Sequence, residues 1–323
     1  MPFTRPPSGD GSASLWLSKL SPNDKPWDIH RASAETVSYL YKQIGYDRYS
    51  ERTQGCSKWL EFGLRTAETG EMTLKLFMAR FCRTRHCPVC QWRRSLMWRA
   101  RFLRVMPAII AAHLTARYVF LTLTVRNCPV EELRETVKEM NNAWNRLRGR
   151  KQFPAIGFVR SLEVTRNTKD GTAHPHFHCL LMVSPSYFTG RQYLSQAKWT
   201  DLWKDCLKVD YTPVVNVKAV KPKKGTDISD TNALVPALCE TLKYSVKEAD
   251  LVADAHWLQE ITKQLHKVRS IAVGGIFKDY LSEEDPEDLI HGDIDPDESL
   301  ENAPKLIFDW STIIKRYGKR SEP

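Results

Sequence analysis

The chain has 323 residues, of which 42% are hydrophobic and 27% are charged. This balance excludes a mainly disordered protein, and no stretch approaches the roughly 18 consecutive apolar residues that a membrane span needs. Residues 1–14 contain no apolar signal segment, so we expect a protein of the cytoplasm with no membrane partner.

The charge is more informative than the composition. The chain carries 48 Lys and Arg against 38 Asp and Glu, a formal net charge of +10. Residues 281–304 hold ten acidic residues and no Lys or Arg, and residues 305–323 hold five basic and two acidic residues. Residues 1–280 therefore carry 43 basic and 26 acidic residues. This excess predicts a polyanionic partner, most simply nucleic acid, although charge kept for solubility is the alternative explanation.

Four segments differ in composition and pattern. Residues 1–55 form an N-terminal arm and helical segment, and residues 56–113 are rich in Cys and Arg. Strands and helices alternate in residues 114–280, which we expect to be the main globular domain. Residues 281–323 are predicted to be an acidic linker and C-terminal tail, with a short helix over 305–323.

Four of the eight cysteines are close together in the sequence: Cys56, Cys82, Cys87 and Cys90. In a chain with no sign of secretion, such a group favours a metal site over disulfides. The spacing Cys-x₄-Cys-Pro-Val-Cys predicts a tetrahedral Zn²⁺ site with Cys56 as the remote ligand. His86 is an alternative ligand, and free thiols in a core are the alternative interpretation.

Residues 80–104 surround this group with eight arginines, two tryptophans and no acidic residue. Such a surface is typical of one that contacts phosphates, whereas a solvated helix face would carry both signs of charge. The arginines that we expect to bind DNA are Arg83, Arg85, Arg93, Arg94, Arg99 and Arg101.

Hydrophobic periodicity predicts the elements of the central segment in order. It indicates a strand over 118–125, a helix over 131–148, a hairpin of strands 157–166 and 174–183, a helix through Trp199 and Cys206, and a strand over 214–220. Hairpin strands with helices between them predict an α+β fold, an antiparallel sheet with helices on one face.

The second hairpin strand begins with His174-Pro-His176-Phe-His178. Alternate residues of a strand share a face, so the histidines point away from the core. On the partner strand, Glu163 lies between two apolar core residues and projects to the histidine side. Two imidazoles and one carboxylate leave coordination positions open for substrate oxygens, as a catalytic metal requires, whereas structural histidines are the alternative.

A helix is predicted over residues 236–247, with Pro236 in its first turn. Glu240, Tyr244 and Lys247 share its polar face at i, i+4 and i+7. A phenol has a pKa of about 10, so Tyr244 could act as a nucleophile only with help, for which Glu240 is a candidate base and Lys247 a candidate cation. An exposed amphipathic helix is the alternative.

Together these motifs resemble the rolling-circle plasmid replication initiators (Rep proteins) of the HUH endonuclease superfamily, in the group with one catalytic tyrosine. Residues 120–124 (FLTLT) match the family's first motif, and His176-Phe-His178 matches its metal motif. Residues 240–244 (ETLKY) match the Glu-x-x-x-Tyr arrangement, with Lys247 in the place of a Tyr-x-x-Lys. The resemblance implies a ferredoxin-like or RRM-like core, and similar Cys-x-x-Cys segments occur in the family.

The resemblance also implies a mechanism. Mg²⁺ or Mn²⁺ on His176, His178 and Glu163 would polarise a phosphate of single-stranded or hairpin origin DNA, with His174 a competing third ligand. Tyr244 would attack it, leaving a 5′-phosphotyrosyl link and a 3′-OH for the host polymerase, and Glu240 would activate water at termination. The host polymerase and helicase would be the protein's partners.

Three other functions are compatible with the same residues. A relaxase or transposase of the superfamily would use the same chemistry in transfer or transposition. A DNA-binding regulator would keep the fold and form no covalent adduct. A metal-dependent phosphodiesterase would use water as the nucleophile, with Tyr244 only structural.

Overall fold

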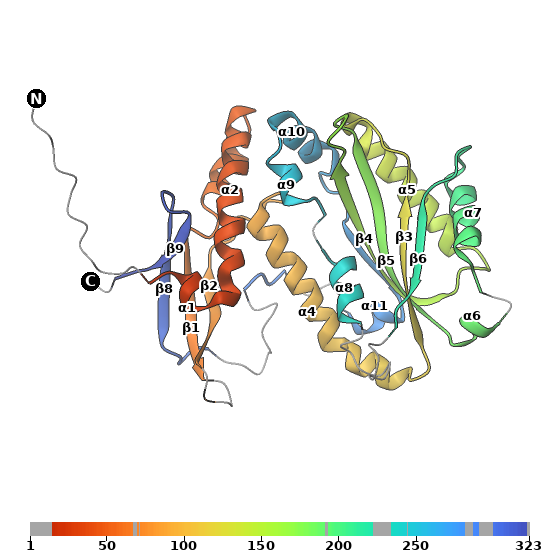
Figure 1. The fold of residues 1–323 in the computed structure, drawn as a ribbon, viewed down its shortest axis with the longest axis horizontal. Coiled ribbons are helices and arrows are strands. Elements are labelled where there is room, and N and C mark those ends of the chain that lie inside the picture. The colour runs from red at the N-terminus through yellow and green to blue at the C-terminus, as the bar shows by residue number, and fades with distance from the viewer. Residues whose placement is uncertain are drawn as a thin grey trace, which may run out of the picture.

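The computed structural model describes residues 15–66, 70, 72–190, 193–221, 234–243, 245–281, 287–290 and 300–321. The described residues contain two antiparallel sheets, and the long helix α4 (Pro88–Ala112) runs between them (Figure 1). No helix in this part of the chain is both long and apolar enough to cross a membrane.

The larger sheet has five strands in the order β6-β3-β5-β4-β7, and every neighbouring pair is antiparallel. Its strands agree with the predicted ones and add a fifth at one edge: β3 (Arg117–Thr124), β4 (Ala155–Arg166), β5 (Ala173–Val183), β6 (Val215–Ala219) and β7 (Ile271–Gly275). The β4–β5 hairpin pairs Glu163 with His176. The expected α+β class and antiparallel sheet are therefore confirmed.

One face of this sheet is mostly apolar and buried, with the guanidinium of Arg160 over the ring of Phe177 as a polar exception. Leu121, Phe177 and Leu181 belong to a large buried cluster with the apolar stripe of α5 (Leu133–Arg148). Helices α7 (Gln196–Leu207) and α10 (Ala255–Gln264) contribute to the same cluster. The predicted helices over 131–148 and around Trp199 are confirmed.

The opposite face is covered by helices only in part. Val159, Leu180 and Met182 pack against α4, α8 (Val235–Thr241) and α11 (Ile276–Tyr280). The prediction of helices on one face was therefore wrong. At one end of the sheet the strands carry apolar residues on both faces. At the other end, the second face carries polar residues.

The second sheet has the order β2-β1-β8-β9 and joins the two ends of the described chain. It consists of β1 (Trp59–Thr66), β2 (Met72–Ala79), β8 (Lys305–Ser311) and β9 (Arg316–Lys319). Residues 305–319 are thus two strands, which corrects the short helix that the sequence predicted. Trp27 of α2 (Lys25–Gln43) packs edge to face against Phe62 and Tyr317 of this sheet.

The remaining elements are short: α1 (Leu17–Leu20), α3 (Asp47–Gln54), α6 (Ser186–Thr189), α9 (Glu248–Leu251) and the 3₁₀ turns η1 (Pro22–Asp24) and η2 (Val130–Glu132).

Candidate functional site

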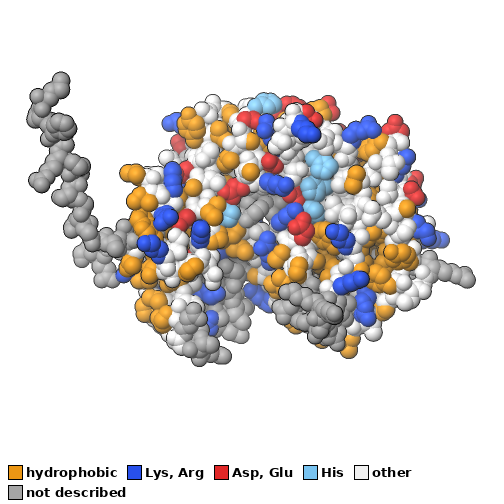
Figure 2. Space-filling view, in the orientation of Figure 1, with side chains coloured by type: hydrophobic (Ala, Val, Ile, Leu, Met, Phe, Trp, Pro, Cys, Tyr) orange, Lys and Arg blue, Asp and Glu red, His pale blue; other side chains and the backbone are white. Residues whose placement is uncertain are grey.

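Glu163, His176 and His178 lie together at the polar end of the second sheet face. Nε2 of His176 is 3.1 Å, and Nε2 of His178 is 2.8 Å, from the same oxygen, Oε2 of Glu163. The three ligand atoms lie within 4.8 Å of one another. Figure 2 shows histidine side chains on this face with basic and acidic side chains beside them.

The other ring nitrogens of the two histidines have partners that orient the rings. Nδ1 of His176 is 3.2 Å from the carbonyl oxygen of His174, and Nδ1 of His178 is 3.3 Å from Oγ1 of Thr122 on β3. A carbonyl only accepts, so Nδ1 of His176 donates to it, and the other ring nitrogen, Nε2, faces Glu163. Hydrogen bonds of this kind orient metal-ligating histidines.

A lysine that the sequence did not single out completes the group. Nζ of Lys243 is 2.9 Å from Oε2 of Glu163 and 2.6 Å from Oε1 of Glu240. Burial favours a lower pKa for Lys243, but its hydrogen bonds to the two carboxylates raise the pKa above its ordinary value. The ammonium group therefore stays charged beside both acids.

The charge states suit a cation. Burial favours a higher pKa for Glu163, but hydrogen bonds from His176, His178 and Lys243 outweigh it and hold the pKa well below its ordinary value. Burial lowers the pKa of His178, so its imidazole is neutral near pH 7. Two imidazoles and a carboxylate converge on one point, which is the donor set of a divalent metal with open positions.

His174, the competing third ligand, is placed differently. Its Nδ1 is 2.7 Å from Oδ1 of Asn127, and it does not belong to the group of three converging ligand atoms found among the described residues. Glu163, not His174, thus lies opposite the His-x-His pair.

The polypeptide of residues 236–247 is not one helix. Helix α8 ends at Thr241, and α9 begins at Glu248 with Lys247 as its N-cap. Between them, the backbone N–H of Val164 donates to the carbonyl of Ser245, and Val246 pairs with Val164 in a parallel bridge. The prediction of one continuous helix was therefore wrong: after α8 the chain leaves the helix and runs along β4.

The three residues expected on that face have separate positions. Glu240 lies in the last turn of α8, with its Oε1 3.9 Å from Nε2 of His178. Lys247 is exposed at the N-cap of α9, and in the described part of the chain Lys243, not Lys247, pairs with Glu163 and Glu240. Tyr244 lies outside the described residues.

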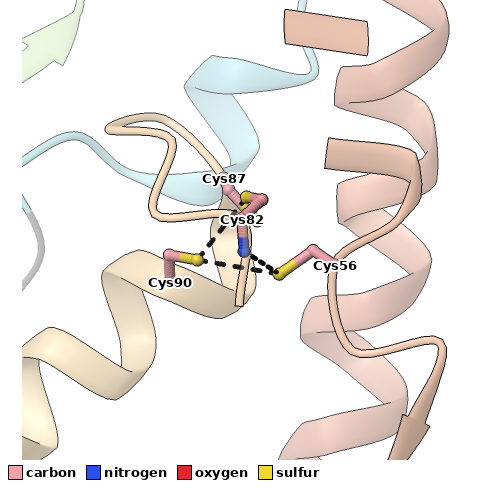
Figure 3. Close-up of side chains that lie close together, drawn as sticks. All are labelled: Cys56, Cys82, Cys87 and Cys90. Carbon is pink, nitrogen blue, oxygen red and sulfur yellow. Dashed lines mark hydrogen bonds between the residues drawn. The ribbon is translucent and has the colours of Figure 1, made fainter. Parts of the chain in front are cut away.

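The four predicted cysteines form a second cluster, away from the histidines (Figure 3). Sγ of Cys90 is 3.6 Å from the sulfurs of both Cys56 and Cys82, and all four sulfurs lie within 4.8 Å of one another. Ligands about 2.3 Å from a tetrahedral Zn²⁺ have sulfurs about 3.8 Å apart, so the cluster fits this ion. His86 is not part of the group.

Polar contacts at the cluster favour thiolates. The backbone N–H of Thr84 lies 3.4 Å from Sγ of Cys82, and that of Cys82 lies 3.5 Å from Sγ of Cys56. Hydrogen bonds from the neighbouring thiols, first Cys56, lower the pKa of Cys82, whereas burial raises that of Cys87. Three of the four cysteines are buried and Cys82 is half-buried, and a metal ion bound by all four would hold their sulfurs in one place.

The expected DNA-binding arginines fall into two groups. Arg93 is 4% exposed and donates to the carbonyls of Leu289 and Ile290, so it is placed as a structural residue. Arg85 and Arg94 are half-buried, Arg83 is exposed, and all three line a cavity beside the histidine site. The other two, Arg99 and Arg101, are half-buried on α4.

Comparison with known proteins identifies relatives along most of the chain. The profile of the replication protein family matches residues 73–318. The chain is 34% identical over 306 residues to Protein rep of Streptococcus pneumoniae, covering 91% of this chain and 92% of the relative. It is 36% identical over 312 residues to Protein rep of Lactiplantibacillus plantarum, covering 91% and 95%. No solved structure gives a significant match.

Proposed function

Because the chain belongs to the replication protein family, we propose that it initiates rolling-circle replication of a plasmid by nicking and rejoining one strand of the origin. The convergence of Glu163, His176 and His178, directly beside Lys243, is the observation that carries this proposal. This arrangement supports a site that holds a phosphate close to Lys243, the residue directly before Tyr244 in the sequence.

The proposed chemistry is a transesterification. A divalent ion bound by the two histidines and Glu163 would polarise the phosphate as a Lewis acid. Tyr244 attacks phosphorus, the bond to the 3′-oxygen breaks, and the products are a 5′-phosphotyrosine and a 3′-OH. Lys243 offsets the negative charge that develops, and Glu240 removes the proton from a water molecule when replication ends.

The choice of metal follows from the donor atoms. Mg²⁺ prefers an all-oxygen shell, whereas two imidazole nitrogens and a carboxylate suit a softer divalent ion. We therefore favour Mn²⁺ over Mg²⁺ at Glu163, His176 and His178. A structural Zn²⁺ on the four cysteines is a separate part of the proposal.

The proposal assigns partners and a place of action. The substrate is origin DNA in single-stranded or hairpin form, and the free 3′-OH is extended by the host polymerase behind a host helicase. Both act in the cytoplasm, where the protein would therefore work.

The nucleophile is tested by Tyr244→Phe. The protein is incubated with single-stranded origin DNA and Mn²⁺, and the products are separated on a denaturing gel with peptide mapping of any adduct. We expect nicking to fall by at least about 10³-fold because the attacking oxygen is absent, with origin binding retained.

Tyr39→Phe is the matched control, because Tyr39 is an exposed tyrosine on α2. Persistence of a covalent adduct in Tyr244→Phe would contradict the nucleophile. Cleavage by the wild type without an adduct would favour the water-using phosphodiesterase, and binding without cleavage would favour the regulator.

A further inference from the structure

A cavity of about 480 Å³ opens beside the histidine site, between helix α4 and the β4–β7 edge of the larger sheet. This volume lies within the roughly 300–1,000 Å³ typical of sites for small molecules. Lys243 lines the cavity and also contacts Glu163, so the cavity and the candidate metal centre share a wall. Ser245, on the other side of Tyr244 in sequence, lines it as well.

One wall of the cavity is positively charged. It includes Arg83, Arg85, Arg94 and Arg269. The carboxylate of Glu287 forms an ion pair with Arg94, and its carbonyl oxygen accepts a hydrogen bond from Arg83. Arg94 thus already holds an anionic group at this position, and Arg83 binds the backbone of the same residue.

A neighbouring part of the lining suits a base. The indole of Trp98 is half-buried and lines the cavity, with the guanidinium of Arg101 5.5 Å from its ring centroid. Gln91 and Ser161 supply buried polar groups. An aromatic face next to arginines is the combination by which proteins hold single-stranded nucleic acid, by stacking a base and neutralising its phosphate.

The register of the sheet fixes the distance to the metal centre. Ser161 of β4 pairs with His178 on one side and with Ile271 on the other. Ser161 and Ile271 line the cavity, so it begins one strand away from the imidazole of His178. Adjacent strands are about 4.8 Å apart, so a nucleotide in the cavity would be a close neighbour of a phosphate at the histidines.

We propose that this cavity binds one nucleotide of the single-stranded DNA next to the cleaved phosphate, with its base against Trp98 and its phosphate on Arg83 and Arg94. The proposal rests on the proposed function for the identity of the strand. Helix α4 of the Cys- and Arg-rich segment then supplies part of the substrate site. The phosphate of the bound nucleotide displaces the carboxylate of Glu287.

The test compares two oligomers of equal charge, oligothymidylate of 12 nucleotides and an abasic 12-mer, by fluorescence anisotropy without added Mn²⁺ or Mg²⁺. The full-length wild type is expected to prefer the thymidylate. Stacking contributes about 1–3 kcal/mol per base, so Trp98→Ala should lower this preference at least about fivefold. Trp98→Phe keeps an aromatic face and should retain most of it.

The phosphate contact is tested with Arg83→Ala. It should weaken binding of both oligomers and lower the slope of log K against log salt concentration by about 0.7. Arg150→Ala is the matched control, because Arg150 is exposed and pairs with Asp205 of α7, which packs on the opposite face of the sheet.

Two results would overturn the proposal: an unchanged preference in folded Trp98→Ala, or an Arg83→Ala slope equal to that of the control. The measurement needs no cleavage, so it is separable from nicking. If the wild type does not nick origin DNA, yet Trp98→Ala loses the preference for thymidylate, the proposed nicking function is refuted and the nucleotide site stands.

Discussion

Lys243 forms ion pairs with two carboxylates of the candidate site. Its ammonium group bridges Glu163 and Glu240. The sequence favoured Lys247 instead, because a continuous helix would have placed Lys247 beside Tyr244. The signal available was that Lys243 stands three residues after Glu240, a spacing that forms ion pairs within one turn.

Replacement of this lysine should strengthen metal binding. Lys243 lies 2.9 Å from the proposed ligand oxygen of Glu163, so it repels a divalent ion bound there. Like charges about 4 Å apart cost roughly 1 kcal/mol in water and more in a partly buried site. We expect Lys243→Met to bind Mn²⁺ at least about fivefold more tightly by titration calorimetry.

Lys247→Met is the comparison for this change, because Lys247 is exposed at the N-cap of α9. Its Mn²⁺ affinity should equal that of the wild type. Weaker binding in Lys243→Met would mean that the lysine orients Glu163 rather than competing with the ion.

The histidine pair and Glu163 could be placed from sequence because their relation is local. A two-residue period sets the side of β5 on which His176 and His178 project, and a turn of six residues, 167–172, brings β5 back beside β4. No long-range information is needed for either step. The helices α4, α8 and α11 that cover the same face come from distant segments, and their packing on it was not predicted, although a helix from Pro236 was.

At the scale of elements, the segment after α8 shows why periodicity can mislead. Leu238, Leu242 and Val246 have helical spacing, yet they serve two cores. Leu238 and Leu242 pack with α4 and α11, whereas Val246 belongs to the cluster with α5 and α10. The hydrogen bond from Val164 to the carbonyl of Ser245 replaces a helical one, so tertiary pairing overrides the local pattern.

The cysteine cluster joins three elements, and this predicts the effect of breaking it. Cys56 follows α3, Cys82 follows β2, and Cys87 and Cys90 begin α4. Cys87→Ser should lower bound zinc well below one per chain and lower the Tm by at least about 5 °C, because metal binding contributes to folding. Metal content and thermal unfolding measure both.

Cys206→Ser is the control for this change. Cys206 is a buried free cysteine of α7, so the variant makes the same replacement of sulfur by oxygen away from the cluster. It should keep the zinc of the wild type. Full zinc retention in Cys87→Ser would contradict a four-thiolate site.

At the scale of the whole molecule, the second sheet could not be predicted because its pairing is remote in sequence. Leu60 of β1 pairs with Phe308 of β8, and no local pattern links segments so far apart. The acidic stretch between them in the sequence favoured a solvated tail, and the hydrophobic residues of 305–319 were read as a helix.

This sheet connects the C-terminal strands to the cysteine cluster. The buried hydroxyl of Tyr317 donates to the carbonyl of Ser57, at 2.6 Å, and lies 3.0 Å from its Oγ. Ser57 follows Cys56 directly. We expect Tyr317→Phe to lower the free energy of unfolding by about 1–2 kcal/mol and to speed zinc release to a chelator about threefold or more.

Tyr39→Phe again serves as the control, measured by urea unfolding and a colorimetric chelator. If Tyr317→Phe lost stability but released zinc at the wild-type rate, β9 would support the sheet without positioning Cys56.

The place of β8 beside β1 has a consequence for biosynthesis. A ribosome makes α2 and β1 long before β8, so the second sheet stays incomplete until β8 has been synthesised. Meanwhile the hydrogen-bonding groups along one side of β1 lack their strand partner and can associate with other nascent chains. Premature termination upstream of residue 305 should therefore yield aggregation-prone fragments.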